Sequence, residues 1–206
     1  MVTDTMILPE IANHLRQDRE RLERKVDHIL DSFASQVKKS RVFPISKKVE
    51  WTSPARNTWA IFLYAEKRSD WDKLRYLPVC FFMNKGGKCG YTYVEDDKRK
   101  SIDILYLPHF FQRYKERTGC QGSPYDDFFM HFFDVIIDNC PSERWQKKGD
   151  KTIVGRIDGG IILGERMGRL QVFYTFVTDG LLKDGQKEYI DMLDENLQEH
   201  RENEEH

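Results

Sequence analysis

The sequence predicts an α+β fold, and three features of its pattern indicate this class. A helical stripe lies near the N-terminus, two groups of strand-like segments follow it, and two helix-like segments stand between these groups. Helices and strands in separate runs are typical of α+β proteins, whereas strict alternation would favour a parallel α/β sheet. The length of 206 residues suits one domain with an appendage. We therefore expect an N-terminal helical appendage at 1–40, a single α+β domain at 41–198 and a charged, disordered tail at 199–206.

The first expected element is a long amphipathic helix. Apolar residues from Ile11 to Val37 recur at steps of mostly three, four and seven, and Pro9 fits the first turn. The opposite face is crowded with charge, as in the run 16–21. We expect this helix to pack against its own domain, and a coiled coil with a second copy is the alternative.

Strands are expected in the next part of the chain. Aromatic and β-branched residues concentrate around Trp51 and in four further segments, 59–64, 74–83, 90–94 and 101–106. Gly86-Gly87 marks a turn between two of these segments, so the pattern predicts an antiparallel meander. A later three-stranded meander is expected at 152–157, 161–166 and 170–178, with turns at Asp158-Gly159-Gly160 and near Gly168.

Two central helices are expected between the meanders, and one more near the end of the chain. The first begins at Pro108 and stops at Thr118-Gly119, because proline suits a first turn and glycine suits a C-terminal cap. The second runs from Pro124 to about Asn139 and begins with a variant of the capping box. The C-terminal helix is expected at 184–198.

The charge balance restricts the classes of function. The chain has 33 basic and 34 acidic residues and a formal net charge of -1. A protein that coats or binds duplex DNA usually has a strong basic excess, because phosphate neutralisation supplies most of its affinity. Nucleic-acid binding by this chain would therefore depend on a local basic cleft.

Cysteine usage and the apolar segments indicate the compartment. The four cysteines, Cys80, Cys89, Cys120 and Cys140, show no Cys-x-x-Cys spacing, which favours buried or free thiols in a reducing compartment over a zinc site. The first residues lack the regions of a secretory signal, and no apolar stretch approaches the roughly 20 residues that span a bilayer. We expect a cytoplasmic protein without a membrane partner.

The expected helix that begins at Pro108 carries the main candidate site. Three aromatic residues share one side of its helical wheel and predict the core stripe: Phe110, Phe111 and Tyr114. His109, Arg113 and Arg117 follow one another at intervals of four residues. These three side chains therefore form a ladder along one flank of the helix.

The residue types of this ladder suit proton transfer at a phosphate. His109 lies in the first turn, where the positive end of the helix dipole disfavours the imidazolium form, so a neutral general base is expected there. Arg113 and Arg117 could hold a phosphate through charge-assisted hydrogen bonds and stabilise a dianionic transition state. The alternative is a solvent-exposed helix face with ordinary ion pairs, such as Arg113 with Glu116.

The run 108–117, Pro-His-Phe-Phe-Gln-Arg-Tyr-Lys-Glu-Arg, resembles the His-x-x-x-Arg-x-x-x-Arg helix of a ribonuclease group that includes the barnase, EndoU, colicin and RelE-like families. In that group the helix precedes an antiparallel sheet, and a Ser, Thr or Tyr late in the sheet completes the site. Thr175 and Thr178 lie in the corresponding late strand. The resemblance implies metal-independent RNA cleavage, with His109 as acid or base and with the two arginines on the phosphate.

Two other patterns favour structural roles. Asp127 and His131 are four residues apart on the second central helix and could share a metal, but two ligands are too few and an exposed face explains them. The Asp158-Gly159-Gly160 run lacks the spacing of a phosphate-binding loop and indicates a hairpin turn.

Two hypotheses for the function follow. The first is an RNase-like or phosphodiester-handling domain that acts on RNA without a cofactor or metal, through His109, Arg113, Arg117 and Thr175 or Thr178. The second is a non-catalytic α+β module, whose sheet or N-terminal helix binds a protein partner or a second copy of the chain. An inactive relative of the nuclease fold is a variant of the second hypothesis.

Overall fold

The structure is a computed structural model that describes residues 1–3, 5–95, 101–119, 132–133, 144–146, 152–157 and 159–182. This part of the chain consists of helices and one large mixed sheet, so the predicted α+β class is confirmed. The helical elements are α1 (Leu8–Arg16), α2 (Arg19–Lys39), η1 (Arg68–Asp72), α3 (Pro108–Thr118) and η2 (Asp179–Leu181). The strands are β1 (Ile45–Thr52), β2 (Thr58–Ala65), β3 (Arg75–Asn84), β4 (Gly87–Glu95), β5 (Ser101–Tyr106), β6 (Arg144–Gln146), β7 (Thr152–Ile157), β8 (Gly160–Met167) and β9 (Leu170–Thr178).

The sheet joins two antiparallel meanders. Its strand order is β1-β2-β3-β4-β5-β9-β8-β7-β6, and every neighbouring pair is antiparallel except β5 and β9. In this parallel pair, Asp103 lies opposite Leu170 and Tyr106 lies opposite Phe173. The short strand β6 and the parallel junction have no counterpart in the sequence-based expectation.

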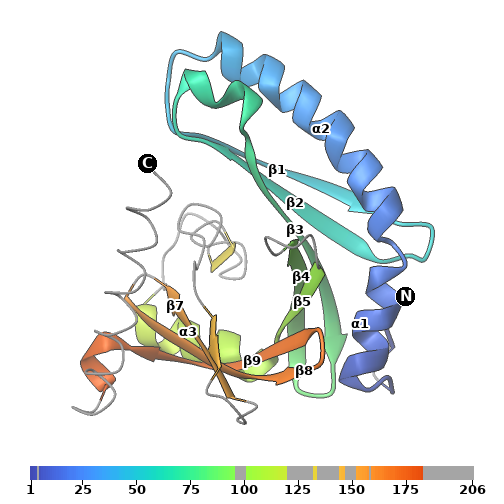
Figure 1. Cartoon of the computed structure of the whole chain (residues 1–206), viewed down its shortest axis with the longest axis vertical. Helices are drawn as coiled ribbons and strands as arrows, with labels where there is room; N and C mark the ends of the chain where they lie inside the picture. Colours follow the sequence, from blue (N-terminus) through green and yellow to red (C-terminus); the bar gives the residue numbers. More distant parts are fainter. Residues whose placement is uncertain are drawn as a thin grey trace.

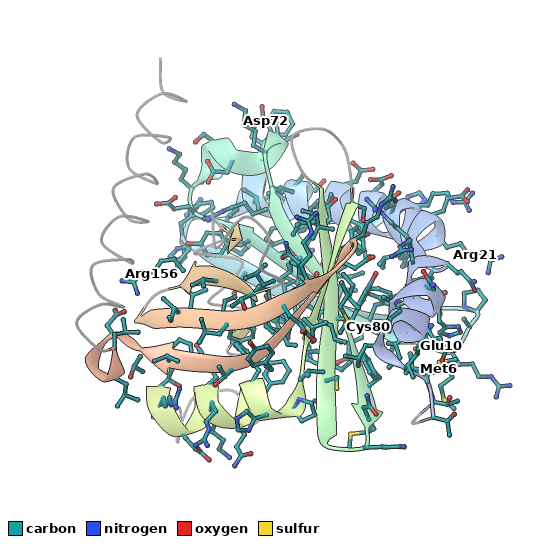
Figure 2. All side chains as sticks on the ribbon, turned by 60° about the horizontal axis from the view of Figure 1, so that its bottom comes forward. Met6, Glu10, Arg21, Asp72, Cys80 and Arg156 are labelled. Carbon is teal, nitrogen blue, oxygen red and sulfur yellow. The ribbon has the colours of Figure 1, made fainter. Side chains whose placement is uncertain are left out.

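The helices α1 and α2 cover one face of the sheet (Figure 1). Their apolar side chains pack with those of β1 to β5 and β9 in one core cluster, and Figure 2 shows Cys80 on this side of the sheet. The expected N-terminal helix therefore packs on the same chain. It is not continuous, however, because the helix is broken at Gln17 and Asp18.

The break between α1 and α2 lies at a buried carboxylate that bonds to residues distant in the sequence. Asp18 is only 3% exposed, and its carboxylate accepts hydrogen bonds from Asn57 Nδ2 at 2.7 Å and Trp59 Nε1 at 3.2 Å. A buried carboxylate needs such donors, and both come from the turn and strand that follow β1. The apolar periodicity continues through this point, which explains why the sequence pattern predicts a single helix.

The helix α3 lies against the opposite face of the sheet (Figure 1). Its three predicted core residues are between 0% and 3% exposed, and they pack with Phe132 and Phe133, which are also helical. Gly90 of β4 makes room for these rings, because a Cβ atom there would lie 2.9 Å from Phe133 Cζ and 3.2 Å from Phe111 Cζ. The remainder of the second central helix, the C-terminal helix at 184–198 and the tail lie outside the described residues.

The two described cysteines are buried thiols. Cys80 is 1% exposed and Cys89 is 0% exposed. Burial raises the pKa of each thiol to about 12, so both are protonated at neutral pH. Cys120 and Cys140 lie outside the described residues. No helix in the described part of the chain is long and apolar enough to cross a membrane.

Candidate functional site

The helix α3 has a proline in its first turn, a glycine at its C-terminal end and a backbone hydrogen bond to β9 just before it begins. Pro108 occupies the first turn, and the backbone N–H of the preceding Leu107 donates to the carbonyl of Phe173 in β9 at 3.0 Å. Gly119 ends the helix with a φ of 63°, the left-handed conformation that glycine adopts without strain. The first turn of α3 therefore lies beside the middle of β9.

His109 and Arg113 lie together on the exposed flank of α3. The Nε of Arg113 donates to the Nε2 of His109 at 3.4 Å. Arg113 also donates to Glu116 Oε2 at 2.9 Å, and Gln112 donates to Glu116 Oε1 at 2.9 Å. The bonds from Gln112 and Arg113 lower the pKa of Glu116, so this carboxylate stays ionised and offsets the charge of Arg113.

Arg117, the third member of the predicted ladder, bonds to the sheet. Its guanidinium donates to the backbone carbonyl of Phe176 in β9. This bond ties the last turn of α3 to the strand on which the helix packs. His109 and Arg117 are eight positions apart, about 12 Å along the helix axis, so the two side chains act at opposite ends of α3.

The two predicted threonines of β9 lie away from His109. The ring of Phe176 faces α3, with its centroid 5.2 Å from that of Tyr114. Successive side chains of a strand point to opposite faces, so Thr175 lies on the face of the sheet away from α3. Thr178 is the last residue of β9, two residues beyond the carbonyl that Arg117 binds. The structure therefore brings His109 and Arg113 together and places Arg117, Thr175 and Thr178 elsewhere.

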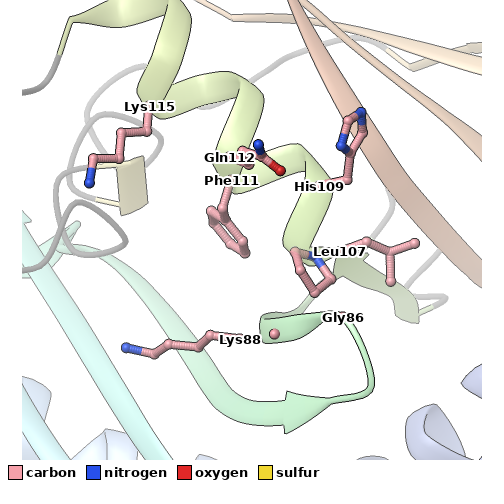
Figure 3. A pocket seen from close by; sticks show the side chains of 9 residues that line it. Gly86, Lys88, Leu107, His109, Phe111, Gln112 and Lys115 are labelled. Atoms are coloured by element: carbon pink, nitrogen blue, oxygen red, sulfur yellow. The ribbon is translucent and has the colours of Figure 1, made fainter.

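A surface pocket lies between the first turns of α3 and the hairpin that joins β3 and β4 (Figure 3). Its volume is about 520 Å³, which is within the usual range for small-ligand sites. The pocket is lined by Gly86, Gly87, Lys88, Leu107, Pro108, His109, Phe111, Gln112 and Lys115. Gly87 has a φ of 127°, and a Cβ atom there would lie 3.4 Å from Pro108 Cβ, so glycine permits this approach.

Basic side chains predominate among the polar residues of the pocket. Lys88, His109 and Lys115 line it, and none of the described lining residues is a carboxylate. Figure 3 shows the side chains of Lys88 and Lys115 on the same side of the pocket, with Phe111 between helix and hairpin. The Lys88 ammonium lies 4.7 Å from the centroid of Phe81. The pocket thus combines an apolar floor with a basic rim.

The sequence-based reasoning missed Lys88 and Lys115 as candidate site residues. The strand β4 pairs with β5 so that Gly90 lies opposite Tyr106. An antiparallel pair of this kind places the start of β4 beside the end of β5, and hence beside the helix that follows β5. This register is observed in the structure and was not predicted from the sequence, so Lys88 could not be assigned to the site in advance. The 3.6-residue period places Lys115 one turn after Phe111.

Within the residues that the structure describes, no three His, Cys, Asp or Glu side chains are grouped closely enough to hold a metal ion. Asp127 and His131, the pair considered as metal ligands, lie outside those residues. Comparison with known proteins finds no matching family model, no matching curated protein and no matching solved structure.

Proposed function

We propose that this protein binds the phosphodiester backbone of single-stranded RNA at the pocket between α3 and the β3–β4 hairpin. The observation that carries the proposal is the convergence of two lysines, Lys88 from the hairpin and Lys115 from α3, on one pocket that His109 also lines. Lysine ammonium groups hold phosphate oxygens through charge-assisted hydrogen bonds. The apolar floor formed by Leu107 and Pro108 suits a sugar or a base edge.

The small net charge of the chain supports a short binding site. A formal net charge of -1 does not attract a long polyanion over the whole surface. A local site with two lysines would contact about two phosphates, so the affinity is expected to be modest and dependent on salt. A single strand fits this arrangement better than a duplex, because its backbone can bend into a pocket.

For cleavage of the bound strand, we assign the role of general base to His109. RNA carries its own nucleophile, the 2′-hydroxyl, so a site on β9 is not required for this chemistry. His109 would take the proton of the 2′-hydroxyl as its oxygen attacks the adjacent phosphorus, and the 5′-oxygen would leave with a proton from solvent. Lys88 or Lys115 would stabilise the charge that develops on the phosphate oxygens.

Binding without cleavage is the second candidate function, and the contacts of the arginines favour it. Arg113 is paired with Glu116, and Arg117 is bonded to the carbonyl of Phe176. The resemblance to ribonucleases implies that both guanidinium groups bind one phosphate. Their contacts direct them elsewhere. The binding proposal does not depend on these two side chains.

The binding proposal is tested by titrating a short labelled RNA and following fluorescence anisotropy. We expect Lys88→Gln and Lys115→Gln each to weaken binding about fivefold, which corresponds to roughly 1 kcal/mol per charged hydrogen bond lost. Lys25→Gln, on the exposed face of α2, makes the same charge change away from the pocket and should leave binding unchanged. No binding by the wild-type protein at low salt, or equal losses in all three variants, would overturn the proposal.

Cleavage is tested with the same RNA in the presence of EDTA. If His109 is the general base, His109→Ala should lower the cleavage rate by a factor of about 10² to 10⁴, while binding changes little. An RNA with a 2′-deoxy nucleotide at the cleaved position should bind and remain intact. Binding without cleavage by the wild-type protein would assign the second function.

A further inference from the structure

In the part of the chain that the structure describes, the outer edge of β1 is an open strand edge. In the order of the nine-stranded sheet, β1 stands at one end, and no strand within the described residues pairs with its outer side. Its eight residues pair with β2 from Ile45 to Thr52 without a bulge or register shift. A regular edge of this length can accept a further strand by backbone hydrogen bonding.

The hydrogen bonds of the β1–β2 hairpin determine which backbone groups face outward. The N–H of Ser53 donates to the carbonyl of Asn57 at 2.9 Å, so Ser53 and Asn57 form a hydrogen-bonded pair. Such pairs alternate along an antiparallel ladder, so the odd-numbered residues of β1 bond to β2. The N–H and carbonyl groups of Ser46, Lys48, Glu50 and Thr52 therefore point away from the sheet.

We propose that a second copy of this chain pairs antiparallel with β1 about Val49, so that Lys48 of each copy lies opposite Glu50 of the other. Even-numbered residues must pair with even-numbered residues, because only these present outward backbone groups. The two neighbouring registers that keep this rule are centred on residue 48 and on residue 50. The first places Lys48 opposite Lys48, and the second places Glu50 opposite Glu50. Like charges in directly opposed positions are destabilising, so the charges of β1 select the register about Val49.

The side chains on both faces of β1 are compatible with this pairing. Lys48 and Glu50 share one face, are 42% and 61% exposed, and already form an ion pair at 3.0 Å within the strand. In the paired sheet they would form a cluster of four alternating charges. On the other face, Val49 and Trp51 are half-buried against the core cluster of α1 and α2, and pairing would cover more of their surface.

Lysines on an edge strand are also a common protection against unselective pairing. Here this protection and the proposed contact are compatible, because Lys48 disfavours the neighbouring register about residue 48 and favours the register about Val49. The symmetry axis would pass between the two Val49 residues, perpendicular to the sheet. The helices α1 and α2 of both copies would then lie on the same face of a continuous sheet.

Analytical ultracentrifugation of charge-reversal variants tests the contact. Lys48→Glu and Glu50→Lys each replace two attractive contacts with two repulsive ones, so the dissociation constant of the dimer should rise at least about tenfold. The double variant restores opposite charges at both contacts and should return the constant to within about threefold of the wild type. Arg24→Glu reverses a charge on the exposed face of α2, where Arg24 is 67% exposed, and should have no effect.

Three results would overturn the proposal. The wild-type protein could remain monomeric at every concentration, the dimer could be insensitive to the reversals, or the double variant could fail to restore it. Circular dichroism of each variant excludes unfolding as the cause of a lost dimer. None of these results bears on RNA binding, because Lys48 and Glu50 do not line the pocket.

A cysteine on the proposed symmetry axis supplies a second test that does not depend on charge. Val49 would lie opposite Val49 in a pair without hydrogen bonds, where the Cα atoms are about 4.5 Å apart and a disulfide is feasible. Val49→Cys should therefore give a disulfide-linked dimer on mild oxidation. Thr52→Cys, which would lie opposite Ser46, is the matched control. Equal cross-linking of the two variants, or none with Val49→Cys, would contradict the register.

Discussion

Asp103 is a charged residue that the fold buries almost completely. Its side chain is 1% exposed, and it accepts hydrogen bonds from Arg16 of α1 and from the hydroxyl of Tyr91 at 2.6 Å. The hydrogen bond to Asp103 raises the pKa of Arg16, so the guanidinium remains charged. A carboxylate removed from water requires such partners, and this contact joins α1 to β5 near the centre of the sheet.

Removing Arg16 should therefore destabilise the protein strongly. We expect Arg16→Leu to lower the free energy of unfolding by about 3 kcal/mol, because it leaves Asp103 buried without its cation. Urea denaturation followed by circular dichroism measures this change. Arg24→Leu removes an exposed arginine of α2 and should change the free energy by no more than about 0.5 kcal/mol. Similar effects of the two substitutions would show that the buried pair does not hold α1.

Tyr91 should make stability fall at alkaline pH. Burial, and then the nearby carboxylate of Asp103, raise the pKa of Tyr91 above its ordinary value. In the unfolded chain the phenol loses its proton above about pH 10, whereas the folded protein retains it, so the unfolded state is favoured as pH rises. The contribution of protonated Tyr91 to the free energy of unfolding is fully present below about pH 10. Above this pH it declines by up to about 1.4 kcal/mol per pH unit.

Comparison with Tyr91→Phe isolates this effect. The variant lacks the titrating phenol, so its free energy of unfolding should fall less steeply between about pH 10 and about pH 11 than that of the wild type. Urea denaturation at a series of pH values gives the two slopes. Because the substitution also removes the bond to Asp103, the slope and not the absolute stability is the informative quantity. Identical slopes for the two proteins would show that Tyr91 does not cause the loss of stability at alkaline pH.

At the scale of elements, local patterns predicted most of the described strands and α3. Turn residues such as Gly86-Gly87 and Gly119 and the alternation within β7 to β9 are encoded within a few residues of the element that they delimit. The break at Asp18 was not predicted, because it depends on Asn57 and Trp59, which are distant in the sequence. The short strand β6 lacked a pattern long enough to predict.

The position of α3 depends on the absence of a side chain at Gly90. A Cβ atom there would approach Phe133 Cζ to 2.9 Å, so Gly90→Ala should shift the rings that join α3 to β4. We expect a loss of about 1 to 3 kcal/mol in the free energy of unfolding, which is typical of overpacking in a core. Gly180→Ala, where a Cβ atom meets nothing within 4 Å, is the matched control and should change little. Equal stability of the two variants would contradict this packing.

At the scale of the whole molecule, the parallel pair of β5 and β9 joins the two meanders. No local signal predicted it, because strands at 101–106 and 170–178 are joined by a long connection and their pairing depends on the overall topology. The composition of the candidate site likewise depends on contacts between segments that are distant in the sequence. The helical period predicted the neighbourhood of His109 and Arg113, but Lys88 enters the pocket from another element, and the faces of β9 were not predicted.

The central claim is that the pocket between α3 and the β3–β4 hairpin binds phosphodiesters. The most direct test is the salt dependence of RNA binding by the wild type and by the Lys88→Gln, Lys115→Gln double variant. For a single strand, each phosphate contact contributes about -0.7 to the slope of log affinity against log salt concentration. We predict that the double variant has a slope shallower by about 1.4, the contribution of two contacts. An unchanged slope would contradict the claim, because it would show that neither lysine contacts the RNA backbone.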